Sequence, residues 1–270
     1  MLYLISTPIG NLSDFTFRGV ETCKLCDYLL CEDTRRSSIL LDHYQIKKPL
    51  KSYHLFNETE KLSAILKDLA NGLNIGVLSD GGTPALCDPG ALLVKSCIEQ
   101  NLPITTIPGP CALIQALILS GFPTHPFQFF GFMPRKEGEI LALLPLLLAF
   151  EGVSLFYESP QRLADTLHIL ARVAPQTETA VAREITKTFE EVIRLTALGA
   201  SLYFAKNPPR GEVVLLIKGF QQDWNGKAPK DLVEDLIQTY KISMTDSIKT
   251  AAHLLKMPKQ SIYKLFHSEK

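Results

Sequence analysis

Short apolar runs alternate with amphipathic stretches through residues 1–121 of this 270-residue chain. Apolar runs with the length of a buried strand lie at 2–5, 28–31, 75–78 and 104–107. Stretches with helical spacing lie at 15–25, 58–70, 91–100 and 111–119, and a further one follows residues 32–36 and ends at 41. Because successive parallel strands need a crossover connection, this alternation predicts a parallel sheet with helices on both faces.

The pattern changes near Gly121, Phe122 and Pro123. Further strands are predicted at 127–132, 153–157, 179–182, 191–195 and 213–217, with helices at 140–150 and 163–172. A linker at 221–229 leads to a tail in which 248–255 and 261–266 are typical of two helices around a short turn, as in a helix-turn-helix. The prediction is an α/β protein with a parallel sheet in domain 1–121, a mixed sheet in domain 122–220 and a helical tail at 226–270.

Composition and charge narrow this picture. Apolar residues make up 46% of the chain and charged residues 21%, as in a globular protein. The apolar stretch 140–150 contains Pro145 and is well short of the roughly 20 residues that span a bilayer, so we expect a buried helix and no membrane association. The net charge is zero, but residues 226–270 carry +3. This mild bias is compatible with a tail that contacts phosphates, but it does not establish nucleic-acid binding.

Cysteine usage indicates a reducing, cytoplasmic setting. The six cysteines are scattered among apolar neighbours rather than arranged as a disulfide framework. Cys23 and Cys26 form a C-x-x-C, but no second pair or histidine pair at metal-site spacing accompanies them. We expect buried thiols there and no metal site.

A glycine-rich loop, Ser79-Asp80-Gly81-Gly82-Thr83-Pro84, follows the run 75–78. Loops at the carboxyl ends of parallel strands line the crevice where α/β proteins bind ligands, and glycine lets a ligand approach the backbone. A plain tight turn is the alternative for a single Gly-Gly pair. Similar loops, rich in proline, glycine, serine or threonine, follow other predicted strands at 6–11, 108–110 and 158–162, and 208–212 forms a turn between the predicted strands 191–195 and 213–217.

Several common catalytic motifs are missing. The sequence has no G-x-G-x-x-G after the first strand, no G-x-x-x-x-G-K-[ST] and no G-x-S-x-G, and its histidines form no metal-site pattern. The loops therefore indicate a site that holds its ligand largely through backbone amides and carbonyls. In such a site the ligand itself supplies the chemistry, as a cofactor does.

A set of motifs carries a family resemblance. The motifs are Ser6 to Leu12, Glu32-Asp33-Thr34-Arg35, Ser79 to Pro84 with Asp88-Pro89-Gly90, Pro108-Gly109-Pro110, Phe156 to Pro160, Ala182-Arg183-Glu184 with Thr186-Lys187, and Pro209 to Glu212. In order and spacing from residue 2 to about 219, they resemble the ribosomal RNA small subunit methyltransferase I family of the tetrapyrrole methylase superfamily. Two positions depart from that family: Gly81 stands where it usually has Ala, and Gln161 where it usually has His.

The resemblance implies S-adenosylmethionine bound in a cleft between two α/β domains. It implies methylation of the ribose 2′-hydroxyl of a cytidine in the decoding region of 16S rRNA, within the small ribosomal subunit, by a homodimeric enzyme. By the same resemblance, the residues expected to line the cofactor are Pro8, Asp80, Gly81, Gly82, Thr83, Cys111, Ala112, Tyr157 and Ala182. The substitution at Gly81 should be harmless to a contact made by the backbone.

A ribose hydroxyl is weakly acidic, so a base or a positive neighbour that stabilises the alkoxide would assist transfer. Glu184 and Lys187 are the catalytic candidates, and a solvated ion-pair set at a strand end is the alternative. Asp33, Arg35 and Arg162 are candidates for contacts with the RNA backbone, since arginine suits phosphate. A helix cap for the aspartate and ordinary surface charge for the arginines are the alternatives.

Two other functions stay open at this point. One is carbon methylation of a tetrapyrrole with the same cofactor, for which a basic helical tail would not be required. The other is a helix-turn-helix regulator whose α/β body senses a nucleotide. Against that reading, the tail contains lysine but no arginine, on which base reading in the major groove depends.

Overall fold

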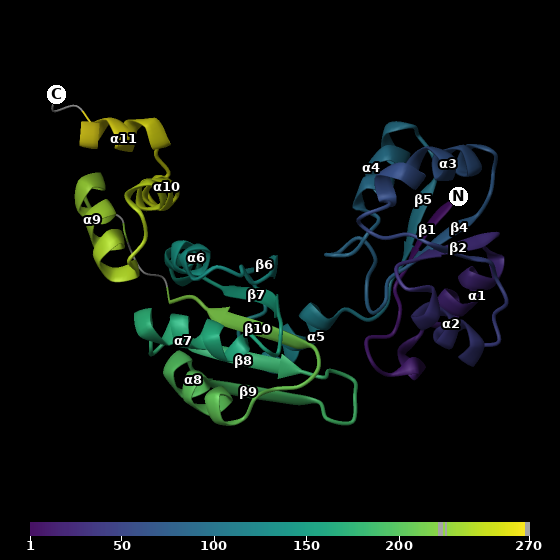
Figure 1. The fold of residues 1–270 in the computed structure, drawn as a ribbon, viewed down its shortest axis with the longest axis horizontal. Coiled ribbons are helices and arrows are strands. Elements are labelled where there is room, and N and C mark those ends of the chain that lie inside the picture. The colour runs from purple at the N-terminus through teal and green to yellow at the C-terminus, as the bar shows by residue number, and fades with distance from the viewer. Residues whose placement is uncertain (221–223, 225, 268–270) are drawn as a thin grey trace. The chain divides into compact units, whose positions relative to one another are not determined.

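A computed structural model describes residues 1–220, 224 and 226–267. The chain forms two compact units (Figure 1). Unit 1 consists of Met1–Ala112 and Ile185–Thr188, and unit 2 of Leu113–Glu184 and Phe189–Lys270. Parts of the predicted linker at 221–229 and the last residues of the predicted tail lie outside the described residues. The division into domains 1–121, 122–220 and 226–270 stays a prediction.

Unit 1 contains a five-stranded parallel sheet. Its strands are β1 (Leu2–Ile5), β2 (Tyr28–Cys31), β3 (Leu50–Ser52), β4 (Ile75–Leu78) and β5 (Ile104–Ile107), in the order β3-β2-β4-β1-β5. Leu2 lies opposite Ile75 on one side and Ile104 on the other. The predicted parallel sheet is confirmed, and all its strands end at the same edge.

Helices cover both faces of this sheet. They are α1 (Phe17–Leu25), α2 (Thr34–His43), α3 (Glu58–Ala70) and α4 (Ala91–Glu99), and a short 3-10 helix, η1 (Leu12–Asp14), precedes α1. Successive side chains of a strand point to opposite faces. Leu30 therefore packs in one cluster with Leu66 of α3, and Leu29 in another with Cys23 of α1. Burial on both faces explains the continuous apolar runs in the sequence.

The thiols of Cys23 and Cys26 are both buried, as the sequence predicts. Burial raises the pKa of each thiol to about 12, and Cys26 adds to the rise at Cys23. Both thiols are therefore protonated near neutral pH, which makes them packing groups rather than nucleophiles.

Several elements were not expected from the sequence, among them η1 and a first helix of the tail, Pro229–Tyr240. Strand β3 has only three residues, Leu50, Lys51 and Ser52, with too little apolar character to be recognised, and it forms by pairing with β2 at the sheet edge. The expectation of four strands in this sheet was therefore wrong. In unit 2 the unpredicted segment Ala197–Lys206 also forms a helix, which Thr196 caps by accepting from the amide of Gly199.

Unit 2 contains the mixed sheet that the sequence predicts. Its strands are β6 (Phe127–Phe132), β7 (Val153–Glu158), β8 (Glu178–Arg183), β9 (Glu191–Thr196) and β10 (Val213–Lys218), in the order β6-β7-β10-β8-β9. Only β6 and β7 pair in parallel, and the other neighbours are antiparallel. The unit begins within α5 (Ala112–Ser120), whose carbonyls at Leu119 and Ser120 accept hydrogen bonds from Arg194 of β9.

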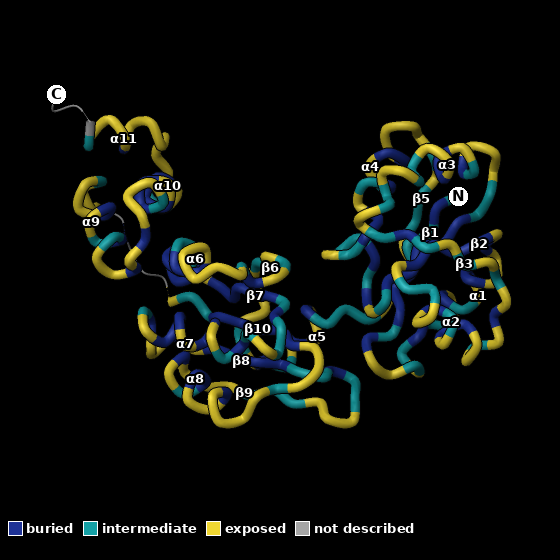
Figure 2. Tube along the Cα trace, viewed as in Figure 1, coloured by how far each residue is buried: buried dark blue, intermediate teal, exposed yellow. Residues whose placement is uncertain are grey.

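One hydrophobic cluster holds the helices of unit 2 together. They are α6 (Glu137–Ala149), α7 (Leu163–Val173), α8 (Ala197–Lys206), α9 (Pro229–Tyr240), α10 (Met244–Leu254) and α11 (Lys259–His267). Leu144 of α6, Leu236 of α9 and Ile248 of α10 are buried in this cluster, which also includes Phe156 of β7. Figure 2 shows the buried parts of these elements in dark blue. The two helices predicted in the tail are α10 and α11, and both are longer than the predicted segments.

Helix α6 is the apolar stretch predicted at 140–150, and it buries Pro145 and the leucines around it. It is 13 residues long. Within the described part of the chain, every helix falls short of the length and apolar character needed to cross a bilayer.

Candidate functional site: strand-exit loops and their polar neighbours

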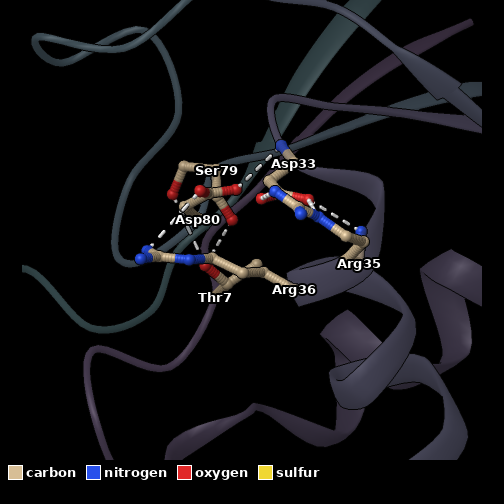
Figure 3. Close-up of polar contacts among 6 residues, drawn as sticks. All are labelled: Thr7, Asp33, Arg35, Arg36, Ser79 and Asp80. Carbon is tan, nitrogen blue, oxygen red and sulfur yellow. Dashed lines mark hydrogen bonds and ion pairs between the residues drawn. The ribbon is translucent and has the colours of Figure 1, made fainter.

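The loops that follow β1 and β4 are joined by their backbones in unit 1. Thr7 and Gly82 exchange two hydrogen bonds, from Thr7 N to Gly82 O at 2.9 Å and from Gly82 N to Thr7 O at 3.0 Å. The Thr7 hydroxyl donates to the Ser79 carbonyl at 3.0 Å (Figure 3). The Ser79 hydroxyl donates to Gly82 O at 3.0 Å. These bonds fix the glycine-rich loop against the loop that contains Pro8.

The loop after β5 joins the same group. Ser6 N donates to Ile107 O at 3.1 Å, and the Thr83 hydroxyl lies 3.4 Å from Pro110 O, which it can reach as a donor. Pro110 directly precedes Cys111 and Ala112, where α5 begins. Of the predicted cofactor residues, the structure thus brings together Pro8, the loop from Asp80 to Thr83, and the start of α5.

The two glycines of the loop differ in what they require. Gly82 is buried and has φ of +95°, and an added Cβ would lie 3.3 Å from Ile9 Cγ2 and 3.7 Å from Pro110 O. Gly81 is exposed, and an added Cβ there would meet nothing closer than 3.6 Å. Glycine is therefore needed at 82 for the backbone conformation, whereas position 81 has room for alanine.

Charged residues surround the outer side of this loop (Figure 3). Asp80 Oδ1 accepts from the Asp33 amide at 3.2 Å, and Asp80 Oδ2 lies 3.6 Å from Arg36 Nη1. Asp33 caps α2 by accepting from the Arg35 amide at 2.9 Å, and it also binds the Arg35 guanidinium at 2.7 Å. The hydrogen bonds from Arg35 lower the pKa of Asp33 to about 2. Asp33 and Arg35 therefore lie next to the predicted cofactor loop as a charged pair.

Asp88 was not singled out as a site residue from the sequence. Burial raises its pKa to about 6, and the carboxylates of Glu32 and Asp80 add to the rise, partly offset by a hydrogen bond with Ser79. Ala85 and Cys87, in the same loop, have positive φ values of 67° and 65°. Its position between a strand exit and Pro89-Gly90 could have marked Asp88 as a site residue from the sequence. Its proximity to Glu32 could not be predicted, because it depends on β2 and β4 being neighbours in the sheet.

Lys187 lies in the short segment that is part of unit 1. An added Cβ at Gly10 would overlap the aliphatic part of the Lys187 side chain. The lysine therefore packs on the same loop that contains Thr7 and Pro8. This places one of the two catalytic candidates beside the predicted cofactor residues of unit 1.

Glu184 follows β8 in unit 2 and has a positive φ of 51°. Its Oε1 accepts from the Glu212 amide at 3.1 Å, and its own amide donates to Glu212 O at 3.1 Å. Its side chain lies over Gly211, where an added Cβ would overlap the carboxylate. The carboxylate is therefore held in place by the turn at 208–212.

Arg162 belongs to a buried polar network. Its guanidinium donates to Glu158 Oε1, to Met133 O at 3.1 Å and to Pro134 O at 3.2 Å. The Glu158 side chain is fully buried, and its Oε2 accepts from the Thr166 hydroxyl at 2.6 Å. Arg162 thus compensates a buried carboxylate, and the contact with RNA predicted for it stays a prediction.

The other predicted cofactor residues of unit 2 lie on the sheet. Tyr157 of β7 contacts Phe129 and Phe132 of β6, with ring centroids 5.0 and 5.6 Å apart. Ala182 of β8 is buried and paired with Val214 and Val192. Their predicted contact with a cofactor stays a prediction. Among the residues that the structure describes, no three histidine, cysteine or carboxylate side chains form a group that suits a metal ion.

Comparison with known proteins identifies the class. A family model described as Tetrapyrrole (Corrin/Porphyrin) Methylases matches residues 1–199. A uroporphyrin-III-C-methyltransferase from Thermus thermophilus aligns with a TM-score of 0.57 and 16% identity over 80% of this chain and 93% of that chain. A cobalt precorrin-4 methyltransferase aligns with the same TM-score and identity over 80% and 94%. The chain has the fold of the tetrapyrrole methylases.

Sequence relatives give the particular family. A protein named ribosomal RNA small subunit methyltransferase I from Halalkalibacterium halodurans is 37% identical over 99% of this chain and 95% of its own length. Proteins of the same name are 37% identical in Bacillus subtilis, over 99% and 94%, and 42% identical in a Hydrogenobaculum species, over 80% and 94%. The chain belongs to the ribosomal RNA small subunit methyltransferase I family, within the tetrapyrrole methylases, as its motifs predict, and it is a methyltransferase.

Proposed function

We propose that the protein transfers a methyl group from S-adenosylmethionine to the ribose 2′-hydroxyl of a cytidine in the decoding region of 16S rRNA. The observation that carries this proposal is the similarity to rRNA methyltransferases over nearly the whole chain, including the tail. The ribose position and the nucleotide follow from the resemblance of the sequence motifs to that family. The small ribosomal subunit as substrate, a homodimeric state and a cytoplasmic location are parts of the same proposal.

The loops of unit 1 suit a cofactor that is held by the main chain. Three strand exits are bound to one another, and Gly82, whose φ of +95° favours glycine, has no side chain to cover its backbone. Free amides at the start of α5 would suit a carboxylate group of the cofactor. We therefore assign cofactor binding to Pro8, Asp80, Gly81, Gly82, Thr83, Cys111 and Ala112, with Tyr157 and Ala182 from unit 2.

When bound, S-adenosylmethionine supplies a methyl group on a sulfonium centre, which an oxygen nucleophile attacks in line. The task of the protein is to orient the ribose hydroxyl and to handle its proton. We assign to Glu184 the acceptance of that proton, because its carboxylate is fixed at the end of β8. We assign to Lys187 the stabilisation of the negative charge that develops on the ribose oxygen.

Substrate binding is proposed for Asp33, Arg35 and Arg162, with the tail as a further contact. The Arg35 side chain is exposed, although Asp33 orients it. A phosphate could therefore approach its outer edge. Arg162 is more enclosed, because Glu158 and two backbone carbonyls share its guanidinium.

Carbon methylation of a tetrapyrrole is the second candidate, because the family model and the structural neighbours carry that chemistry in their names. The structural neighbours share only 16% identity and thus support the fold alone. The relatives at 36–42% identity are named for ribosomal RNA.

The test is methyl transfer from radiolabelled S-adenosylmethionine to small ribosomal subunits that lack the modification. We expect label in 16S rRNA, recovered after nuclease digestion as 2′-O-methylcytidine. A uroporphyrinogen substrate serves as the parallel acceptor. Label in the tetrapyrrole and none in the RNA would favour the second candidate.

A further inference from the structure

A pocket of about 440 Å³ lies at the end of the β8–β9 hairpin in unit 2. It is formed by residues from the ends of both strands, from the end of α8 and from the turn at 208–210. Its volume is within the range of about 300–1,000 Å³ that is typical of small-ligand sites. Glu184, the proposed base, is one of its lining residues.

Aromatic side chains form one part of the pocket wall. Phe189 is 73% exposed, so most of its ring is in contact with solvent and not with the core. Tyr203 is 37% exposed, and its ring is held edge-to-face against the buried Phe204 with centroids 5.1 Å apart. The pocket therefore combines an exposed aromatic, Phe189, with an aromatic that the core orients, Tyr203.

Hydrogen-bonding groups form the other part. Arg183 and Glu191 are paired at 2.7 Å, and Glu184 is fixed by the Glu212 amide. Asn207 Nδ2 donates to Tyr203 O at 2.9 Å, which directs its amide group but leaves Oδ1 as an acceptor. The carboxylates of Glu184 and Glu191 and the Asn207 Oδ1 thus offer acceptors within the pocket, and the carbonyl end of α8 beside it adds partial negative charge.

Arg210 differs from the other charged residues of the pocket. It is exposed in the turn after Pro208 and Pro209, and it forms no ion pair among the residues that the structure describes. An arginine without an ion pair, beside a pocket that offers carboxylate and amide oxygens, suits a ligand with a negative group outside and amino groups inside. A free phosphate would be disfavoured within the pocket by Glu184 and Glu191 but could bind at Arg210.

An unpaired nucleotide has this combination of groups. Its base has flat faces that stack on aromatic rings and amino groups that donate to carboxylate and amide oxygens, while its phosphate binds arginine. We propose that this pocket holds the base of an unpaired nucleotide of the substrate RNA, stacked on Phe189, with Arg210 on the adjoining phosphate. The inference rests on the proposed function and adds a subsite to it.

The test compares KM and kcat for unmethylated small subunits among single variants. We expect Phe189→Ala to raise KM about tenfold or more, in line with the loss of one base–aromatic stack. Phe189→Trp should keep the wild-type KM because it preserves a stacking surface. Arg210→Ala should raise KM and make it less dependent on salt, by about one phosphate contact.

Two controls separate this subsite from general damage. Phe56→Ala is the control matched to Phe189→Ala, because it removes another exposed phenylalanine, which is 97% exposed in unit 1. We expect wild-type kinetics for it. The affinity for S-adenosylmethionine, measured by calorimetry, should be unchanged in every variant. An unchanged KM in Phe189→Ala, or a loss of cofactor affinity in its place, would overturn the inference.

A photocrosslinking residue at position 189, p-benzoylphenylalanine, identifies the partner directly. Crosslinks to a nucleotide of 16S rRNA support the inference, whereas crosslinks to a ribosomal protein overturn it in favour of a peptide-binding pocket. Absence of methyl transfer by the wild-type enzyme would instead contradict the proposed function. The two failures are therefore distinguishable.

Discussion

Thr7 and Gly82 exchange a pair of backbone hydrogen bonds at 2.9 and 3.0 Å, beyond the ends of β1 and β4. These strands are neighbours in the middle of the parallel sheet. The bonds extend their pairing into the loops, so the glycine-rich segment has one fixed conformation rather than that of a free turn. A main-chain binding surface is thus organised before any ligand arrives, which lowers the entropic cost of binding.

Replacement of Gly82 by valine should abolish cofactor binding. A β-branched side chain is strained at φ of +95°, and its Cβ would meet Ile9 at 3.3 Å. We expect the protein to stay folded by circular dichroism while calorimetry detects no binding of S-adenosylmethionine. Gly81→Ala is the matched control, because position 81 has space for a Cβ, and it should bind the cofactor like the wild type. Wild-type affinity in Gly82→Val would refute the assignment of this loop.

Removal of the Arg162 side chain should destabilise the protein. Arg162→Ala leaves the Glu158 carboxylate buried without its charged partner, which costs about 3 kcal/mol in the free energy of unfolding. Arg35→Ala removes an exposed arginine and should change that free energy by less than about 0.5 kcal/mol. Urea denaturation of both variants measures the difference. If Arg162→Ala unfolds like the wild type but binds small subunits weakly, its role is substrate contact instead.

Four strands of unit 1 could be predicted from the sequence because burial on both faces requires continuous apolar runs, such as 75–78. Strand β3 escaped prediction because Lys51 and Ser52 depend on pairing with β2 rather than on their own pattern. The convergence of the loops followed from the parallel order of the strands. The partners of Arg162 could not be predicted, because Met133 and Pro134 reach it from a distant part of the chain.

Asp88 should make the stability of the protein depend on pH. Its pKa in the folded state is about 6, above its ordinary value of 3.8, so the folded protein binds the proton more tightly than the unfolded chain. The contribution of this group to stability is greatest below the unfolded pKa and falls as pH rises between these two values. Asp88→Asn should therefore stabilise the protein by roughly 1 kcal/mol above this window, after solvent screening, and have little effect below it.

Thermal unfolding of the wild type and of Asp88→Asn from acid to neutral pH measures this difference. Asp42→Asn, which makes the same substitution at an exposed position of α2, is the matched control. A stability difference that is the same at all pH values would show that Asp88 acts through packing and not through ionisation.

Glu184→Gln should reduce turnover while the fold is retained. The glutamine oxygen can accept the hydrogen bond from the Glu212 amide in place of Oε1, so the side chain keeps its position. It cannot take up a proton from the ribose hydroxyl, and a loss of about 100-fold in kcat is expected. Single-turnover kinetics with saturating small subunits and cofactor measure it. A variant with wild-type kcat and an unchanged pH profile would leave Glu184 with a structural role only.

Lys187→Ala should lower turnover more than cofactor affinity. The aliphatic part of this side chain lies on the loop at Gly10, beside the predicted cofactor residues, and the proposal assigns its ammonium group to the developing alkoxide. Loss of such a charge lowers kcat by about 100-fold, and Lys187→Arg, which keeps the charge, should recover part of it. Lys24→Ala, at an exposed position of α1, is the control. Equal losses in kcat and in calorimetric affinity for S-adenosylmethionine would assign Lys187 to cofactor binding, and wild-type turnover would remove it from the mechanism.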